Sequence, residues 1–263
     1  MKFFKSIFNL KIISMLAFGF VVGWLLMYPE DWMWGLAMLI WEKVVLSILS
    51  KEISQHRYFC HRSFETGKFR RYFLMGCTVF GPTDPITVTM IHQKHHVHSD
   101  QSDDPHLPTM NMFSRFIGTA FTLRSYNYWG TLLATMQPPK RMVRDSHLVF
   151  LHKHSNLLFN MLCLVFLLVS WKFVVFVLLA SRGFFSVNSA LFGLILTHIK
   201  MPGGYQSFDT KDKSYNTPWL GYFHPGESFH NNHHFKPNAY NFAMKPGEFD
   251  VVGWIIGKVF VTR

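Results

Sequence analysis

Long apolar runs dominate the chain and set its structural class. Three of them stand out, at residues 10–27, 32–49 and 157–170. A helix of about 20 mostly apolar residues spans the hydrocarbon core of a bilayer. A soluble protein of this composition would instead alternate polar and apolar positions far more often. The pattern therefore predicts an all-α membrane protein.

The runs predict four transmembrane helices. Spans at about 10–28 and 32–49 are joined by a tight turn at Pro29-Glu30-Asp31, and a second apolar block fits spans at about 155–171 and 180–198. The turn between the last two spans is expected between Trp171 and Gly183. A shorter run at 72–80, ended by Gly81-Pro82, is too short to cross and should lie at the interface or be buried. Residues 1–263 are predicted to form a single domain.

The net charge of +11 indicates contact with lipid headgroups rather than nucleic acid. Lysines and arginines lie mainly before and between the apolar runs, and no nucleic-acid recognition motif accompanies them. Lys2, Lys5 and Lys11 precede or begin the first span, while the short turn after that span carries only acidic charges. The N-terminus is therefore predicted to be cytoplasmic. Four spans then place residues 50–154, residues 199–263 and the C-terminus on the same side. The first span is long and lacks a clear cleavage site, which favours an anchor over a signal peptide.

Two charged residues, Glu42 and Lys43, interrupt the second span. Charges inside a membrane are costly and often functional. Adjacent residues do not face each other on a helix, so snorkelling and a role facing the bundle both remain open. The three cysteines show neither metal-binding nor redox spacing and are interpreted as small apolar side chains in a reducing environment.

The chain contains 15 histidines, and most of the candidate chemistry lies in three clusters of them. All three clusters fall in segments assigned to the cytoplasmic side. The shared side matters, because one metal site needs all its ligands in one place. The clusters are His56 and His61; His92, His95 and His96; and His230, His233 and His234.

The spacing within the clusters suits metal binding. Positions i, i+3 and i+4 share one face of a helix, so the second and third clusters can each direct three rings the same way. His56 and His61 are rotated by about 140° on an ideal helix, which predicts a helix end or a kink between them. A structural zinc site takes four ligands. Eight histidines fit two metals better, each held by about four rings with positions left open for oxygen.

Five segments resemble the membrane fatty acid desaturases, specifically the Δ9 acyl-CoA or acyl-lipid type. They are HRYFCHRSF, HQKHHVHSDQSDDPHLP, GYQSFDTKDKSYNTPWLG, GESFHNNHH and GEFDVVGWII. The resemblance covers nearly all of the chain after the first span. It implies four transmembrane helices with a cytoplasmic helical cap that carries a histidine-ligated di-iron site. It also implies oxygen-dependent insertion of a double bond into a fatty acyl chain.

The resemblance also implies the ligands of each iron. One iron would be held by His56, His61, His92, His96 and His233. The other would be held by His95, His198, His230 and His234. Leu194 stands where the family usually has an asparagine that holds a metal-bound water, and Val88 stands where a tryptophan is common. Asn188 lies ten residues before His198, too far along a helix to substitute.

Four further residues are expected around the ligands. Asp100, Asp104 and His106 match family positions, and Glu227 belongs to a lone Glu-x-x-His sequence with His230. Carboxylates near metal-bound histidines accept the second ring N–H and fix the tautomer.

The implied substrate is a fatty acyl-CoA or acyl-lipid drawn from the membrane. Electrons must come from an external donor such as ferredoxin or cytochrome b5, because the chain has no flavin fingerprint, haem motif or cysteine cluster. One alternative is a related hydroxylase or ketolase, which shares the first hydrogen abstraction. The other is a non-catalytic membrane protein that binds or transports metal, which would place polar ligands inside the spans.

Overall fold

The chain forms a helical bundle with four long apolar helices. The structure, a computed structural model, describes residues 2–106, 111, 113, 116 and 136–262, with side chains from Leu10 onward. Within this part the regular elements are helices, accompanied by two isolated β-bridges around Asn216. Four helices are long and apolar enough to cross a membrane, which confirms the predicted helical class: Leu10–Met27, Pro29–Cys60, Ser146–Leu167 and Phe173–His198.

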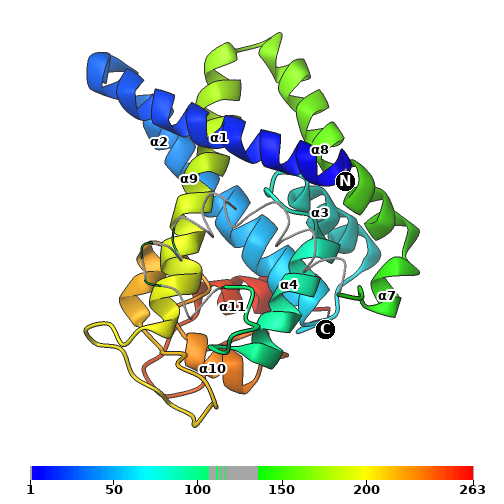
Figure 1. Cartoon of the computed structure of the whole chain (residues 1–263), viewed down its shortest axis with the longest axis vertical. Helices are drawn as coiled ribbons and strands as arrows, with labels where there is room; N and C mark the ends of the chain where they lie inside the picture. The colour runs from blue at the N-terminus through cyan, green and yellow to red at the C-terminus, as the bar shows by residue number, and fades with distance from the viewer. Residues whose placement is uncertain (1, 107–110, 112, 114–115, 117–135, 263) are drawn as a thin grey trace.

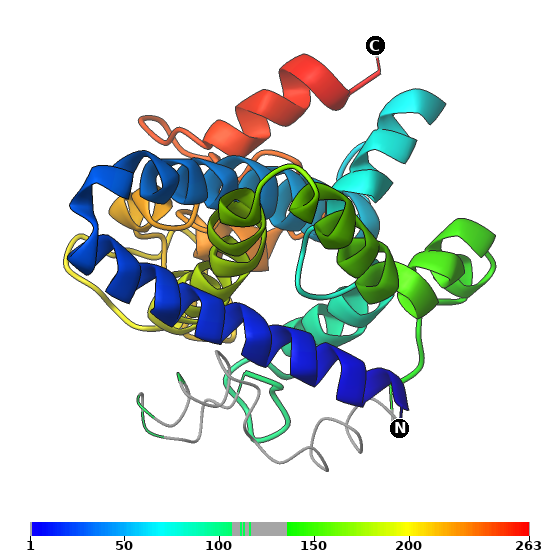
Figure 2. The ribbon, with the colours of Figure 1, turned by 90° about the horizontal axis from the view of Figure 1, so that it is seen from above.

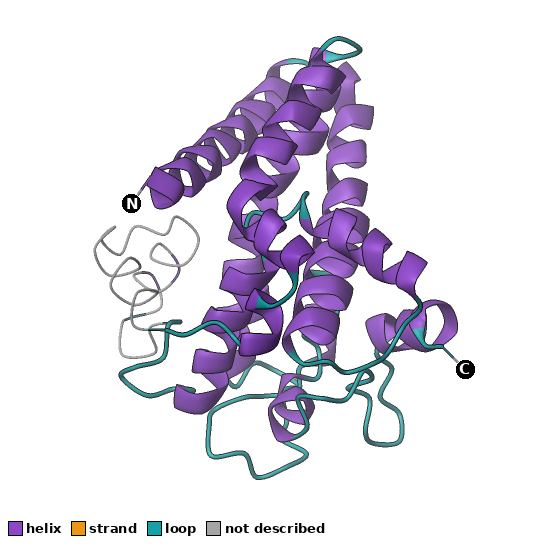
Figure 3. Ribbon diagram, turned by 90° about the vertical axis from the view of Figure 1, so that its right-hand side faces the viewer, coloured by secondary structure: helices purple, strands orange, loops and turns teal. Residues whose placement is uncertain are grey.

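The long helices form two hairpins whose turns lie at the same end of the molecule (Figures 1 and 3). The first hairpin comprises α1 (Lys2–Met27), η1 (Pro29–Asp31), α2 (Trp32–Trp41) and η2 (Glu42–Cys60). The second comprises α8 (Ser146–Leu167), η3 (Phe173–Ala180), α9 (Ser181–Asn188), η4 (Ser189–Ile195) and η5 (Leu196–His198). Asp31 ties the two turns together, since both its carboxylate oxygens lie 2.7 Å from Lys172 Nζ and one accepts a bond from Trp24 Nε1.

The second helix is longer than its hydropathy predicted. It was expected to end near residue 49 but continues without a break to Cys60, so that the segment from Pro29 to Cys60 is 32 residues long. From Glu42 onward it is a π-helix, in which each N–H bonds to the carbonyl five residues earlier. About 20 residues suffice to cross a bilayer core. The remaining turns therefore carry the first histidine cluster past the apolar part of the helix.

Glu42 and Lys43 are both engaged inside the protein. Glu42 is fully buried and accepts hydrogen bonds from Ser47 Oγ at 2.7 Å and Asn188 Nδ2 at 2.9 Å. Lys43 Nζ lies 3.2 Å from Glu42 Oε2 and donates to the carbonyl of Phe223. Glu42 therefore faces the bundle. Although adjacent residues point in different directions on a helix, the long Lys43 side chain reaches back to its neighbour.

The bounds of the second hairpin also differ from those expected. The third long helix begins at Ser146 rather than near 155, because Asp145 caps it by accepting bonds from His147 N at 3.1 Å and Leu148 N at 3.3 Å. The turn at residues 168–170 comes before the predicted region, which began at Trp171. Because apolar residues lie on both sides of this turn, the hydropathy pattern does not indicate its position.

Short helices surround the other end of the bundle, where the histidines lie. Figure 2 shows the C-terminal pair of short helices alongside η2, where Val252, Ile256 and Phe260 pack on Ile53 and Leu74. The short helices are α3 (Lys68–Thr78), α4 (Pro85–His98), α7 (Lys140–Val143), η6 (Pro218–Tyr222), α10 (His230–Phe235), α11 (Val251–Ile255) and η7 (Ile256–Phe260). Most of the predicted short apolar run at residues 72–80 lies in α3.

The close contact between α1 and α9 depends on a glycine. A Cβ added at Gly183 would lie 2.2 Å from the carbonyl oxygen of Ser14. We expect Gly183→Val to lower the stability of the folded protein by about 1–3 kcal/mol, measured by thermal unfolding in detergent. Gly23→Val is the matched control, since nothing lies within 4 Å of a Cβ at that position. An equal loss in the two variants would contradict this packing.

Candidate metal centre

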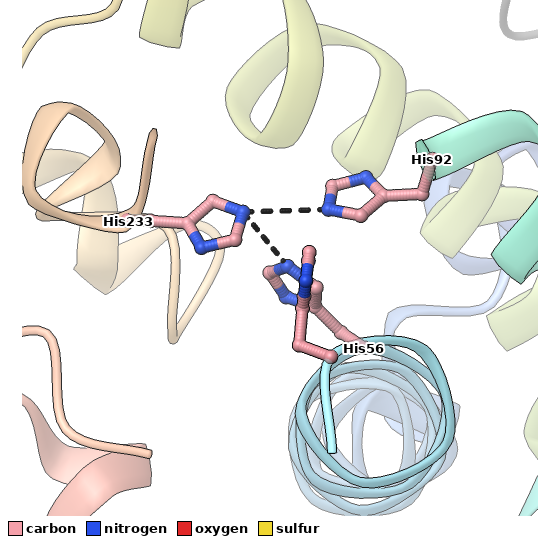
Figure 4. Close-up of side chains that lie close together, drawn as sticks. His56, His92 and His233 are labelled. Carbon is pink, nitrogen blue, oxygen red and sulfur yellow. Dashed lines mark hydrogen bonds between the residues drawn. The ribbon is translucent and has the colours of Figure 1, made fainter. Parts of the chain in front are cut away.

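The nine histidines named from the sequence lie together at the end of the bundle opposite the hairpin turns. Figure 4 shows the rings of His56, His92 and His233 directed toward one another from η2, α4 and α10. His233 Nε2 lies 3.1 Å from His56 Nε2 and 3.3 Å from His92 Nε2. Segments far apart in the chain therefore bring their imidazole nitrogens to one place.

The rings fall into two groups. In group one, a ring nitrogen from each of four histidines lies within 4.8 Å of the others, and His96 Nε2 joins them at 3.0 Å from His92 Nε2 and from His233 Nε2. In group two, four nitrogens likewise lie within 4.8 Å of one another. These are the two sets that the resemblance implied, while nitrogens of His96, His233 and His234 also lie within 4.8 Å of one another across the two groups. Group one is His56, His61, His92, His96 and His233, and group two is His95, His198, His230 and His234.

The wide turn of η2 brings the two histidines of the first cluster together. The backbone N–H of His61 donates to the carbonyl of His56 at 3.0 Å, an i→i+5 bond that stacks residue i+5 over residue i. The two ring centroids are 5.0 Å apart. The helix does end between them, at Cys60. The rings meet, however, because of the wide turn, which the spacing of an ideal α-helix does not contain.

Carboxylates fix the orientation of five of these rings. Each accepts a hydrogen bond from Nδ1, which keeps the proton on that atom and leaves the Nε2 lone pair directed at the group. Asp100, Asp104 and Glu227 were expected beside ligands, whereas Glu52 and Asp212 were missed. The pairs are His56–Glu52 at 2.9 Å, His95–Asp104 at 3.0 Å, His198–Asp100 at 3.0 Å, His230–Glu227 at 2.7 Å and His234–Asp212 at 2.7 Å.

Glu52 and Asp212, the two partners that were not predicted, have only weak signals in the sequence. Glu52 stands one turn before His56 and follows Lys51, so a charged pair adjoins the first cluster at the end of an apolar run. Asp212 lies in a segment already noted for its family resemblance, but its sequence distance from His234 hides the contact.

Two imidazole nitrogens in group two face each other as acceptors. His198 Nε2 lies 3.0 Å from His230 Nε2, while Nδ1 of each ring donates to a carboxylate. Two lone pairs at this distance repel unless a cation lies between them. Nitrogen separations of 3.0–3.3 Å are those of ligands bound about 2.1 Å from a shared ion.

Several buried nitrogens at the site also need a partner. The Nε2 atoms of His61, His95 and His234 have no hydrogen-bond partner within the described part of the chain. A buried polar nitrogen left unpaired is costly. Together with the facing lone pairs, these atoms fit metal ions in both groups.

Burial favours the neutral form of His61 and His234. It lowers the pKa of His61 to about 2 and that of His234 to about 4, with neighbouring histidines adding to the effect. Burial alone would raise the pKa of Asp104, but the hydrogen bonds and charges of His95 and His106 together outweigh burial and hold this pKa below its usual range. The site therefore offers neutral imidazoles backed by carboxylates, the protonation states that metal binding requires.

His106 is placed differently from the carboxylates. Its backbone N–H donates to Asp104 at 2.8 Å, and its ring centroid lies 4.7 Å from that of His95. Its ring nitrogen Nδ1 has no hydrogen-bond partner among the described residues. It therefore packs against a candidate ligand and holds its carboxylate through the backbone.

Asn188 does not take the place of the asparagine that the family usually has at the position of Leu194. Its side-chain nitrogen donates to Glu42 and to the carbonyl of Phe223 at 2.8 Å, which commits it to the polar contacts inside the bundle. Leu194 and Val88 are both half-buried. Group two is thus lined by four imidazoles without that amide.

A family-wide sequence model described as fatty acid desaturase matches residues 53–244, which include all nine histidines. The chain belongs to the fatty acid desaturase family. The assignment made from the histidine clusters is thereby confirmed, and the protein is an oxidoreductase that acts on fatty acyl chains.

Named relatives agree with this membership. The chain is 30% identical over 229 residues to the sn-1 stearoyl-lipid 9-desaturase of Anabaena variabilis, covering 83% of this chain and 77% of that one. It is 27% identical over 246 residues to the Delta-9 acyl-lipid desaturase 2 of Arabidopsis thaliana, covering 89% and 75%. It is 28% identical over 236 residues to the hex-5-enoyl-[acyl-carrier protein] acetylenase of Moorena producens (strain JHB), covering 82% and 70%.

Proposed function

We propose that this desaturase uses two iron ions, one in each histidine group, to remove two hydrogens from adjacent methylenes of a membrane-derived acyl chain. The observation that carries the proposal is the contact between two acceptor nitrogens, His198 Nε2 and His230 Nε2, at 3.0 Å. The site has nine imidazoles and no cysteine, and imidazole suits iron as well as zinc. Membership of the desaturase family is the reason for proposing iron.

The protein's own part in this reaction is position and exclusion of water. An unactivated C–H bond is beyond any side-chain acid or base, so bound iron with O2 supplies the oxidising power. The carboxylates beside Nδ1 hold five imidazoles in fixed orientations. Apolar residues of η2, α4 and α8, such as Phe59, Ile86 and Phe159, pack into one buried core. Holding one methylene pair at the site would select the position of the double bond.

We further propose that the four long helices span the membrane, with both termini and the metal site on the cytoplasmic side. The long helices expose large apolar side chains to the surroundings, including Leu16, Leu26 and Leu164. Aromatic rings gather near the hairpin turns, where Trp24 lies 4.4 Å from Tyr28 and 5.7 Å from Trp171 between ring centroids. Such a belt is typical of a membrane interface. The basic cytoplasmic face would then receive an acidic electron donor such as ferredoxin or cytochrome b5.

The proposed substrate is a saturated acyl chain carried by a lipid or by CoA, with the double bond at position 9. Two of the relatives named above are lipid desaturases of position 9 by name, which supports this choice. The acetylenase among the relatives acts, by its name, on an acyl-carrier-protein substrate. The expression experiment must therefore identify the acyl carrier as well as the product.

Expression in a host that lacks the corresponding unsaturated lipids tests the proposed function. We expect mass spectrometry to find a new double bond in the host's acyl chains, with none formed by the His95→Ala variant, because His95 belongs to group two. Separating lipid, CoA and carrier-protein fractions identifies the carrier. Hydroxylated or keto products would instead support a hydroxylase or ketolase. Unchanged acyl chains in the presence of iron-loaded protein would contradict desaturation.

A further inference from the structure

Four ionisable side chains, three of them buried, lie beside the two histidine groups, and we call them the bridging cluster: Lys51, Glu52, His224 and Glu227. Glu52 and His224 are 0% exposed and Glu227 is 2% exposed. A carboxylate oxygen of each glutamate and a ring nitrogen of His224 lie within 4.8 Å of one another. So many buried ionisable groups are costly unless they act together.

Glu227 contacts both histidine groups. Its Oε2 accepts the bond from His230 Nδ1 of group two at 2.7 Å, and its Oε1 lies 3.7 Å from His56 Nδ1 of group one. Glu52 Oε2 lies 2.9 Å from the same nitrogen of His56. His56 therefore stands against two carboxylates, one of which also orients a ring of the other group.

Lys51 and His224 complete the cluster. Lys51 Nζ lies 3.5 Å from Glu52 Oε1 and 4.0 Å from Glu227 Oε1, so its positive charge offsets the repulsion between the carboxylates. His224 Nε2 lies 3.9 Å from Glu52 Oε1, and neither ring nitrogen of His224 has a hydrogen-bond partner within the described residues. The lysine ammonium already fills the cationic place between the glutamates, which argues against a third metal ion there.

The backbone is built closely around these side chains. Gly226 has φ of +100°, and a Cβ there would lie 2.6 Å from Glu52 Oε2. A Cβ at Gly193 would lie 2.9 Å from Cδ2 of His224. Because there is little free space around Glu52 and His224, a shift of Glu52 must displace Glu227.

We propose that the bridging cluster couples the two metal groups, so that a change in a carboxylate that holds a ring of one group alters the metal affinity of the other group. In this arrangement Glu52 is a positioning residue for His230. It makes no contact with His230 and acts through Glu227, which holds His230 Nδ1. The inference rests on the proposed function, since it requires that both groups bind metal. Independent groups would respond only to changes in the carboxylates that touch their own imidazoles.

Cobalt(II) titration of the full-length protein in detergent tests the coupling. In a His61→Ala/His92→Ala background, group one is disabled, and the visible absorption of bound Co²⁺ reports the dissociation constant of group two. We expect Glu52→Gln to weaken this binding by about 10-fold, the lower end of the effect of losing an outer hydrogen-bond partner. Lys51→Met, a second variant that disturbs both glutamates, is expected to weaken it similarly.

Asp104→Asn is the matched control, because Asp104 holds only His95 of group two. In a His198→Ala/His234→Ala background, where only group one binds metal, we expect Glu227→Gln to weaken Co²⁺ binding and Asp104→Asn to leave it unchanged. Unchanged group-two affinity in both Glu52→Gln and Lys51→Met would overturn the coupling while leaving the proposed function intact. Three Co²⁺ ions per wild-type chain would overturn it in favour of a third site. A wild-type chain that binds neither cobalt nor iron would defeat the proposed function itself.

Discussion

Replacing His198 with alanine is expected to lower the iron content from about two ions per chain to about one and to abolish double-bond formation. His198 is buried, its Nε2 lies 3.0 Å from His230 Nε2, and its Nδ1 is held by Asp100. Its loss leaves three imidazoles in group two and a carboxylate without its partner. Elemental analysis of the purified protein and mass spectrometry of acyl chains measure the two effects.

His147→Ala is the control for this experiment. The His147 side chain is 57% exposed and lies beside Asp145 at the start of α8, far along the chain from either group. It should keep both iron ions and full product formation. If His198→Ala also kept its full iron content, His198 would be removed from the ligands of group two.

Replacing Asp250 with alanine is expected to destabilise the folded protein by about 3–5 kcal/mol, because it leaves a buried arginine without its partner. Arg57 is fully buried, and its two terminal nitrogens lie 2.6 Å and 3.3 Å from the Asp250 carboxylate. The same carboxylate caps α11 and accepts a bond from Phe242 N at 2.9 Å. Thermal unfolding in detergent measures the loss, and iron content should fall with it because Arg57 adjoins His56.

Glu65→Ala is the matched control for the buried pair. Arg62 and Glu65 are 3.9 Å apart, with side chains 65% and 81% exposed, and water screens such a pair. Its removal should change the stability by less than about 0.5 kcal/mol. Equal destabilisation in the two variants would show that the Arg57–Asp250 contact does not hold the C-terminal segment in place.

Hydropathy predicted the helices well but their ends poorly. The end of the second helix was placed near residue 49 because polar residues follow, yet Glu52 and Arg57 are buried against the rest of the protein. The turn at residues 168–170 was missed for the opposite reason, since apolar residues lie on both sides of it. In both places tertiary packing, which no local window contains, decided where the helix ended.

The site shows the same division between local and long-range information. Spacing alone indicated that His92, His95 and His96 share a helix face, while the role of His198 came only from the family resemblance. The contacts of Asp212 with His234 and of His224 with Glu52 join residues far apart in the sequence. Such partners are specified by the fold, so no motif spacing could reveal them.

Because both histidine groups draw imidazoles from α10, the order of synthesis determines when each group is complete. The first hairpin carries only His56 and His61, and α4 adds three more imidazoles. His230, His233 and His234 emerge from the ribosome last, after both hairpins have been made. A nascent chain therefore presents incomplete sets of these imidazoles, and both groups are complete only after α10 has been made.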